Sequence, residues 1–279
     1  MIDTIRITTV VENTARGAHV LAEHGLAFWI EADAQRILLD TGQGKVLLHN
    51  ARRLEIPLER TQTVILTHGH FDHTGGVADV LDVVAQADLY VHPAALEAKY
   101  HREKSPPHRA IGISSRDERA LRKRTRKPVL TKEPVTLADG IHLTGEIPRN
   151  NDFENTGGPF YLDEHCEVSD PLLDDQALYF DTRAGTVVVL GCAHSGVVNT
   201  LDYVARLSGR DKIYAVLGGM HLERASRERL DATAKAFRRY GVQRIGAAHC
   251  TGLRATSYLW SEFPAASFEC CVSSVFAVA

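Results

Sequence analysis

One short segment of the sequence carries several side chains that bind metals in proteins. In residues 67–73, THGHFDH, one residue separates His68 from His70, and Asp72 and His73 follow after Phe71. Because alternate side chains of an extended strand point the same way, His68 and His70 can bind one metal. Asp72 and His73 lie where a helix is expected to begin, and they can bind a second metal. Imidazole nitrogen and carboxylate oxygen are ligands that zinc, iron and manganese accept, so this segment predicts a metal site.

Short apolar strands alternate with helices on both sides of this segment. The continuous apolar stretch 63–67 has the pattern of a strand that is buried on both faces, and it ends where the histidines begin. The alternation predicts an α/β fold. The predicted strands are 4–11, 25–31, 36–40, 63–67, 88–92, 186–190, 213–217 and 244–248, and the predicted helices are 46–54, 77–85, 198–207 and 227–240.

Several other predicted strands also end at a histidine. His194, His221 and His249 each follow a predicted strand of the second half. Ligand sites in α/β proteins lie beyond the carboxyl ends of the strands, so we expect these histidines to converge with His68 and His70 on one site. A further set of histidines is interpreted as ordinary surface or core residues: His19, His24, His49, His101, His108, His142 and His165.

The composition disfavours several functional classes. The formal net charge of −3 makes nucleic acid an unlikely partner. No apolar run is long enough to span a bilayer, and Met1–Arg6 lacks the pattern of a secretory signal. The odd number of cysteines, five, argues against a disulfide framework. We therefore expect a cytoplasmic protein that acts on a small, anionic molecule, and the sequence does not indicate an oligomeric state.

Residues 1–279 are expected to form a single domain that is interrupted by one basic segment at about 97–130. Eleven lysine and arginine side chains lie between Lys99 and Lys127, and Pro106-Pro107 interrupts the stretch. We interpret it as an insertion that forms a lid or a surface helical segment. Its charges either are solvated or pair with phosphate oxygens of a substrate.

Leu66–Gly76, LTHGHFDHTGG, resembles the signature of the metallo-β-lactamase superfamily, and Asp40-Thr41-Gly42 resembles the Asp-x-Gly that ends an earlier strand there. The resemblance implies an αββα sandwich, in which two facing mixed β-sheets carry helices on their outer faces and metals bind at the sheet edge. It also implies two divalent metal ions, with zinc as the first expectation and iron or manganese as alternatives.

A narrower resemblance covers most of the chain. It points to the branch of the superfamily typified by the archaeal 7,8-dihydropterin-6-methyl-4-(ribofuranosyl)aminobenzene-phosphate synthases. Many bacterial members of that branch are known only as metallo-hydrolases, so the motifs do not fix the activity. The segments that carry this resemblance are 144–149 (TGEIPR), 174–178 (DDQAL), 191–196 (GCAHSG), 218–222 (GGMHL) and 249–252 (HCTG).

His194 and His249 are the candidates for the remaining metal ligands. His194 follows a buried strand at a glycine-bounded turn, and His249 stands where the superfamily places its final ligand. Many members carry a metal-bridging Asp where this chain has Cys192. We interpret Cys192 as a small buried residue beside the ligand His194, with a thiolate ligand as the alternative.

Other residues are assigned to catalysis or to substrate binding. Asp72 is expected both to bind metal and to orient the nucleophile. His221 either replaces His249 as a ligand or donates a proton to the leaving group. Glu146 and Arg149 are weaker candidates for substrate binding, and a solvated surface turn is the alternative for both.

These features predict a dinuclear metal-dependent hydrolase. Two divalent ions lower the pKa of a bridging water and supply hydroxide, which is expected to attack a small, anionic ester, lactone or phosphate compound. The resemblance leaves a transferase as the alternative, which condenses a dihydropterin-methyl diphosphate with a ribofuranosylaminobenzene phosphate. A metal sensor without turnover is disfavoured, because glycine-rich turns leave the site open and a closed structural site would carry more cysteine ligands.

Overall fold

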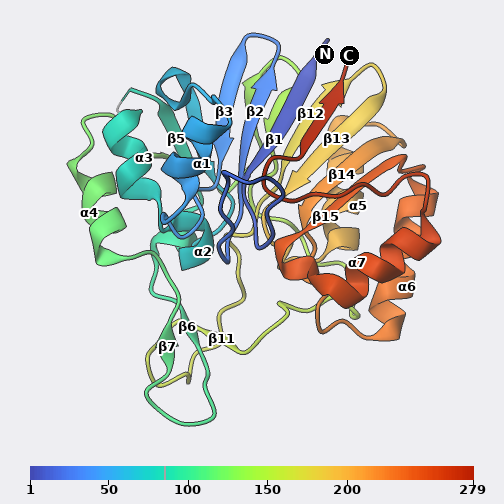
Figure 1. Cartoon of the computed structure of the whole chain (residues 1–279). Helices are drawn as coiled ribbons and strands as arrows, with labels where there is room; N and C mark the ends of the chain where they lie inside the picture. Colours follow the sequence, from blue (N-terminus) through green and yellow to red (C-terminus); the bar gives the residue numbers. More distant parts are fainter. Residues whose placement is uncertain (85) are drawn as a thin grey trace.

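Apolar segments of the chain pair into two β-sheets that face each other. The computed structural model describes residues 1–84 and 86–279, and in that part of the chain helices cover both outer faces of the paired sheets (Figure 1). The predicted α/β class and αββα sandwich are confirmed. The two termini lie close together at one end of the sheets, because β16 (Val275–Val278) pairs with β1 (Ile5–Val11).

The first sheet has the spatial order β16–β1–β2–β3–β4–β5–β8. β1, β2 and β3 are antiparallel, and β2 and β3 form the predicted hairpin, which turns at Asp33 with a left-handed φ of 48°. From β3 to β8 the strands are parallel. These strands are β2 Ala27–Ala32, β3 Gln35–Leu39, β4 Thr63–Leu66, β5 Asp88–Val91 and β8 Val129–Leu130.

The second sheet has the spatial order β15–β14–β13–β12–β10–β9. β13, β14 and β15 are parallel, so their carboxyl ends meet at the same edge of the sheet. β12, β10 and β9 continue the sheet with antiparallel pairing. The strands are β9 Val135–Ala138, β10 Ile141–Leu143, β12 Leu178–Thr182, β13 Gly185–Leu190, β14 Ile213–Gly219 and β15 Arg244–Ala248.

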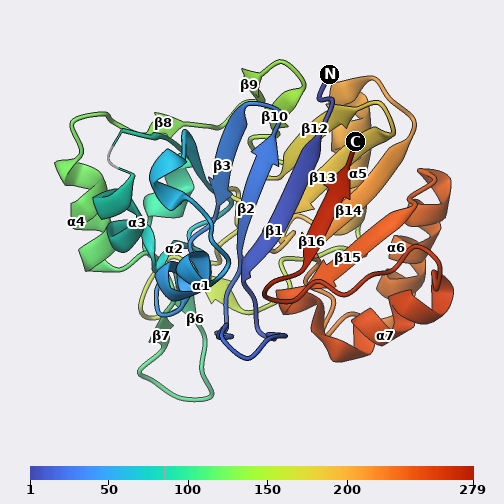
Figure 2. The same cartoon turned by 45° about the horizontal axis from the view of Figure 1, so that its top comes forward.

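Apart from the short helix α2, the helices lie on the outer faces of the two sheets (Figure 2). α1, α3 and α4 lie beside the first sheet, whereas α5, α6 and α7 lie beside the second. The helices are α1 Leu47–Arg53, α2 Phe71–Thr74, α3 Val77–Val83, α4 Ser115–Lys123, α5 Val197–Ser208, α6 Arg227–Arg239 and α7 Gly252–Glu262, with short 3-10 turns at Leu58–Arg60, Pro93–Leu96 and His249–Thr251.

The position of β4 between two packed layers explains why its sequence is continuously apolar. Ile65 packs in the core between the two sheets, whereas its neighbours Val64 and Leu66 pack in the layer between the first sheet and the helices α1 and α3. All three side chains are fully buried. Burial of such a side chain stabilises the fold by about 1.5–3 kcal/mol, so both faces of β4 hold the strand that carries the histidine segment.

The basic segment is not one solvated surface helix. The strands β6 and β7 form a hairpin that joins β11 in a small third sheet, which projects beyond the sandwich (Figure 1). Lys99 is buried and pairs with Asp170 at 2.8 Å and with Asp174 at 3.1 Å, so the interpretation of a solvated charge is wrong for Lys99. The bounds are β6 Tyr100–His101, β7 Arg109–Ala110 and β11 Phe160–Tyr161.

Some predicted boundaries differ from those in the structure. The predicted helix 77–85 corresponds to α3, which ends at Val83, and residue 85 lies outside the described residues. The strands β9, β10, β12 and β16 were not among the predicted strands; most are short, and their alternation is weak. Among the residues that the structure describes, none of the helices has the length and apolar character needed to cross a membrane.

Candidate metal centre

The histidine-bearing strand ends meet at one edge of the sandwich. β4 is followed by the 67–73 segment, part of which forms the short helix α2. In the facing sheet, β13, β14 and β15 are followed by His194, His221 and His249. Groups of histidine, cysteine and aspartate side chains from these strand ends lie with their potential ligand atoms within 4.8 Å of one another. The structure therefore brings the predicted ligands into one cluster.

His68, His70 and His194 form the first group of donors. Nε2 of His68 lies 3.1 Å from Nδ1 of His70, and the ring centroid of His194 lies 4.9 Å from the centroids of both. All three side chains are buried, and Nε2 of His194 has no hydrogen-bond partner among the described residues. A buried polar atom without a partner is costly unless a ligand satisfies it, so this group is suited to a bound cation.

Asp72, His73 and His249 form the second group of donors. Nε2 of His249 lies 3.2 Å from Oδ2 of Asp72 and 3.3 Å from Nε2 of His73. These side chains are buried as well. His249, which comes from the facing sheet, therefore completes a second set of three donors around the start of α2.

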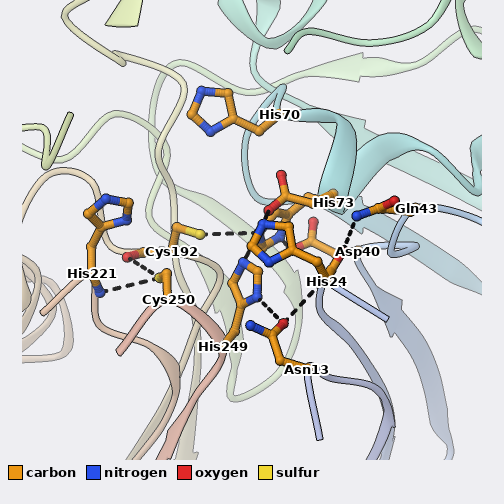
Figure 3. A network of polar contacts seen from close by, with 12 residues as sticks. Asn13, His24, Asp40, Gln43, His70, His73, Cys192, His221, His249 and Cys250 are labelled. Carbon is orange, nitrogen blue, oxygen red and sulfur yellow. Dashed lines mark hydrogen bonds and ion pairs between the residues drawn. The ribbon is translucent and has the colours of Figure 1, made fainter. Parts of the chain in front are cut away.

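Cys192 lies between the two groups. Its Sγ lies 3.1 Å from Nε2 of His73, as Figure 3 shows. The same sulfur is within 4.8 Å of the donor atoms of His68 and His194 on one side and of His249 on the other. Burial raises the pKa of the Cys192 thiol well above its ordinary value, so the thiolate forms only when a cation stabilises it. The geometry favours Cys192 as a ligand that both groups share, in addition to His194.

Four of the ligand imidazoles are oriented through their second ring nitrogen, whereas Nε2 of His70 has no partner among the described residues. A hydrogen bond to that nitrogen fixes the tautomer and directs the other nitrogen at the metal position, as in many metal sites. The partners of Nδ1 are Thr67 Oγ1 at 3.1 Å for His68, Asp40 Oδ2 at 2.7 Å for His73, the Thr156 carbonyl oxygen at 2.8 Å for His194 and Asn13 Oδ1 at 2.8 Å for His249.

Burial and neighbouring charges set the protonation of these groups. Burial lowers the pKa of His70 to about 3, and it lowers the pKa of His68 and His194 well below the ordinary value. Burial also opposes a charge on His73, but the Asp40 carboxylate raises the pKa of His73 to about 9. Neutral imidazole is the form that binds metals, so His68, His70 and His194 are ready to bind at neutral pH.

Residues 174–176 connect the two halves of the centre. They bond to the turn after β4 and to the turn after β13, and Asp174 in turn is held by buried Lys99. The DDQAL segment therefore positions ligands rather than serving as one. The bonds run from Gly69 N to Asp174 Oδ2 at 2.7 Å, from Ser195 N to Asp175 Oδ2 at 2.8 Å and from Gln176 N to the Thr67 carbonyl oxygen at 3.0 Å.

Several residues at the centre have a left-handed backbone although they are not glycines. Such conformations cost free energy and persist where the surrounding structure enforces them, often at functional sites. They direct the strand ends into the cluster. The residues and their φ angles are Asp40 at 59°, Ala193 at 53°, His221 at 46° and His249 at 52°.

His221 lies on the other side of Cys192 from His249. Its ring centroid is 4.4 Å from that of His194, and its Nδ1 has no hydrogen-bond partner among the described residues. The His221 amide donates to Sγ of Cys250 at 3.3 Å, and Figure 3 shows both residues beside Cys192. His249, and not His221, therefore lies with Asp72 and His73.

Sequence reasoning missed or misjudged several residues at the centre. His24 was interpreted as an ordinary histidine, but its Nε2 lies 3.1 Å from Oδ2 of Asp72, and His101 likewise lines the cavity described below. Glu12 accepts a hydrogen bond from the His249 amide at 2.7 Å. Glu12 and Asn13 directly follow β1, so the strand-end signal was available for them, whereas nothing in the sequence marks His24.

Glu146 and Arg149 do not lie among the residues that line the cavity. The Glu146 carboxylate is 43% exposed and lies 3.8 Å from Nε2 of His92. Arg149 donates to the Pro171 carbonyl oxygen at 2.7 Å. Their placement outside the lining of the cavity fits the alternative of a surface turn for both residues.

A cavity of about 1420 Å³ opens in front of the two donor groups. Its walls combine aromatic side chains with arginines and with the carboxylates of Glu12, Glu223 and Glu269, so it suits a substrate that has both an apolar part and a polar part. The hairpin of the basic segment supplies part of one wall. The lining includes the centre residues His70, Asp72, Cys192, His194, His221 and His249 and the wall residues Phe71, His101, Arg109, Phe160, Arg229 and Trp260.

The sequence matches a protein-family model that agrees with this fold and with the cluster of donors at the strand ends. The model of the metallo-β-lactamase superfamily matches residues 21–198, which is more than half of the chain. The chain therefore belongs to the metallo-β-lactamase superfamily. Members of this superfamily are enzymes, and the fold implies a divalent metal site.

Individual relatives extend the similarity over almost the whole chain. The 7,8-dihydropterin-6-methyl-4-(β-D-ribofuranosyl)-aminobenzene-5'-phosphate synthase of Methanocaldococcus jannaschii is 32% identical over 274 residues, covering 94% of this chain and 92% of the relative. An uncharacterised protein of the same organism, MJ0448, is 31% identical over 254 residues, covering 91% and 93%. The crystal structure of Tm1679, a metal-dependent hydrolase of the β-lactamase superfamily, superposes with a TM-score of 0.83 at 28% identity and covers 99% of both chains.

Proposed function

We propose that this protein is a metal-dependent hydrolase that binds two divalent ions, zinc in first place, and acts on a small anionic ester, lactone or phosphate compound. The observation that carries the proposal is the pair of donor groups on either side of Cys192, which face an open cavity. The similarity to Tm1679 supports the same class of reaction.

The residues present fit two divalent ions. His68, His70 and His194 would hold one ion, and Asp72, His73 and His249 would hold the other. Cys192 would lie in contact with both. Imidazole, carboxylate and thiolate together suit zinc, and the unpartnered Nε2 of His194 supports the assignment. Divalent ions bound there would supply Lewis-acid chemistry and lower the pKa of water.

Two side chains are assigned further roles in the reaction. The carboxylate of Asp72 has one oxygen within reach of both His24 and His249, and we assign it to orient the attacking nucleophile. His221 lines the cavity beside His194. We assign its imidazole to donate a proton to the leaving group.

A transferase is the second candidate, and two observations favour it. The relative with 32% identity over most of both chains is a synthase. The cavity of about 1420 Å³ also exceeds the roughly 300–1,000 Å³ of a common ligand pocket, so two substrates can be accommodated. In this reaction the cavity would hold a dihydropterin-methyl diphosphate beside a ribofuranosylaminobenzene phosphate.

A mass-spectrometric turnover assay in ¹⁸O-labelled water separates the two candidates. The metal-loaded protein is offered a panel of anionic esters, lactones and phosphate compounds, and separately both pterin-pathway substrates together and singly. We expect a panel compound to be cleaved with ¹⁸O in the product, and we expect no condensation. A condensed product that requires both pterin-pathway substrates, without cleavage of the panel, would replace the hydrolase by the transferase.

Cys192 is expected to be a metal ligand that spectroscopy can detect. The cobalt(II)-loaded protein should show a thiolate-to-cobalt charge-transfer band, because the Cys192 sulfur lies between the donor groups. Cys192→Ser should abolish the band and weaken metal binding at least about tenfold, since even indirect contacts contribute about 10- to 100-fold. Cys250→Ser, which changes the neighbouring thiol, serves as the control and should retain the band. A band that survives Cys192→Ser would leave Cys192 as a small buried residue only.

A further inference from the structure

Arg229 is a buried cation in the wall of the cavity. It lies in the first turn of α6, its side chain is only 3% exposed, and it is one of the residues that line the cavity. Its Nε and Nη2 have no hydrogen-bond partner among the described residues. These two nitrogens form one edge of the guanidinium group, the edge that pairs with two oxygens of a phosphate or carboxylate at once.

Arg229 makes no direct ion pair within the described part of the chain. Nη1 reaches only Asn155, at 3.2 Å to Oδ1 and 3.4 Å to the carbonyl oxygen. Within residues 1–84 and 86–279, no carboxylate oxygen lies within 4.0 Å of the guanidinium nitrogens of Arg229. By contrast, Arg227 on the same helix pairs with Asp231 at 2.9 Å. Burial lowers the pKa of Arg229, and the charge of the Glu154 carboxylate, which makes no ion pair with it, opposes this only in part. A buried charge without a partner is costly, so Arg229 is not explained as a structural residue.

Arg229 is connected to the metal centre through the neighbouring residues Asn155 and Thr156. Asn155, which contacts Arg229, is followed by Thr156, whose carbonyl oxygen is bonded to Nδ1 of His194. Consecutive Cα atoms are about 3.8 Å apart. The residue that contacts Arg229 and the residue that contacts His194 are therefore direct neighbours in the chain. The amino end of α6, a helix of 13 residues capped by Ser226, adds a favourable field for an anion.

We propose that the guanidinium edge of Arg229 binds an oxyanionic group of the substrate, a phosphoryl or carboxylate group that is separate from the group that reacts at the metal centre. This inference rests on the proposed function and narrows its substrate class to molecules that carry an anion beside the reactive bond. Nε and Nη2 are buried in this structure, so the proposal requires the wall beside Arg229 to open when the group binds.

Inorganic phosphate and acetate are the probes, and both are titrated into metal-free protein by calorimetry. Removal of the metal keeps this test independent of the metal centre, so its outcome does not depend on the proposed reaction. We expect the wild type to bind at least one of the two anions and Arg229→Gln to bind it at least tenfold more weakly. Arg227→Gln, which removes an exposed arginine from the same helix, should bind like the wild type. The preferred probe tells a phosphoryl site from a carboxylate site.

A second measurement uses the wild type alone, in case Arg229→Gln does not fold. The Nε–H signal of Arg229 in a nitrogen-15 NMR spectrum should shift in a saturable way as the anion is added. Equal anion affinity in wild type and folded Arg229→Gln, an unshifted Arg229 signal, or no binding of either anion to the wild type would each overturn the proposal.

Discussion

Replacement of both His68 and His70 by alanine is expected to remove one of two bound metal ions and to abolish turnover. The two side chains supply adjacent donors of the first group, with His68 Nε2 and His70 Nδ1 only 3.1 Å apart. Changes to residues that merely support ligands cost about 10- to 100-fold in affinity or activity, so the loss of two direct ligands should exceed about 100-fold. Metal content per protein, measured by mass spectrometry, and turnover of an active panel compound check this.

The matched control replaces two histidines that are exposed and lie outside the cluster, His19 and His165. That variant should keep both ions and full turnover. If the His68→Ala/His70→Ala variant retained the metal content and activity of the wild type, these residues would not be the ligands, and the assignment of the centre would be wrong.

Asp40→Asn is expected to destabilise the metal-free protein by about 3–5 kcal/mol, the usual cost of breaking a buried pair by changing one partner. The Asp40 carboxylate is 1% exposed and accepts from Thr67 N and Thr67 Oγ1, each at 2.7 Å, and it pairs with His73 Nδ1 at 2.7 Å. The amide of asparagine turns one of these acceptors into a donor. Denaturant unfolding measures the change, and Asp139→Asn, at an exposed site, should leave the free energy of unfolding unchanged.

The same pair predicts a pH dependence of stability. Asp40 raises the pKa of His73 from 6.5 to about 9 in the folded metal-free protein. The stabilisation by the charged pair is therefore fully present below pH 6.5 and is lost as the pH rises through about 9. The wild type should lose the part of its advantage over Asp40→Asn that comes from the charged pair across that interval, and keep the part that comes from the bonds to Thr67. A difference between the two proteins that stays constant with pH would show that His73 is neutral beside Asp40.

The sequence predicted the parts of the centre that lie on regular strand ends. The apolar pattern of residues 63–66 and the spaced histidines after it specify a buried strand and a cluster of side chains on one edge, because strand geometry fixes which side chains point the same way. The convergence of His194 and His249 followed from the rule that the carboxyl ends of parallel strands meet at one edge.

Residues whose roles depend on irregular loops were not predictable in this way. His24 precedes β2 in an irregular loop, and only the folded chain brings its Nε2 to Asp72. The position of Cys192 between two donor groups depends on the left-handed turn at Ala193. The basic pattern around Lys99 predicts a surface charge, because its two aspartate partners come from residues 170–174, far away in the sequence.

Anomalous X-ray diffraction from crystals of the metal-loaded protein, recorded at the absorption edges of zinc, iron and manganese, tests the central claim most directly. Two anomalous peaks are expected at the absorption edge of one of these metals, with zinc as the first expectation. One should lie among His68, His70 and His194 and the other among Asp72, His73 and His249, with the Cys192 sulfur between them. No peak at this cluster, or a single peak bound only by Cys192, His221 and Cys250, would contradict the two-metal centre.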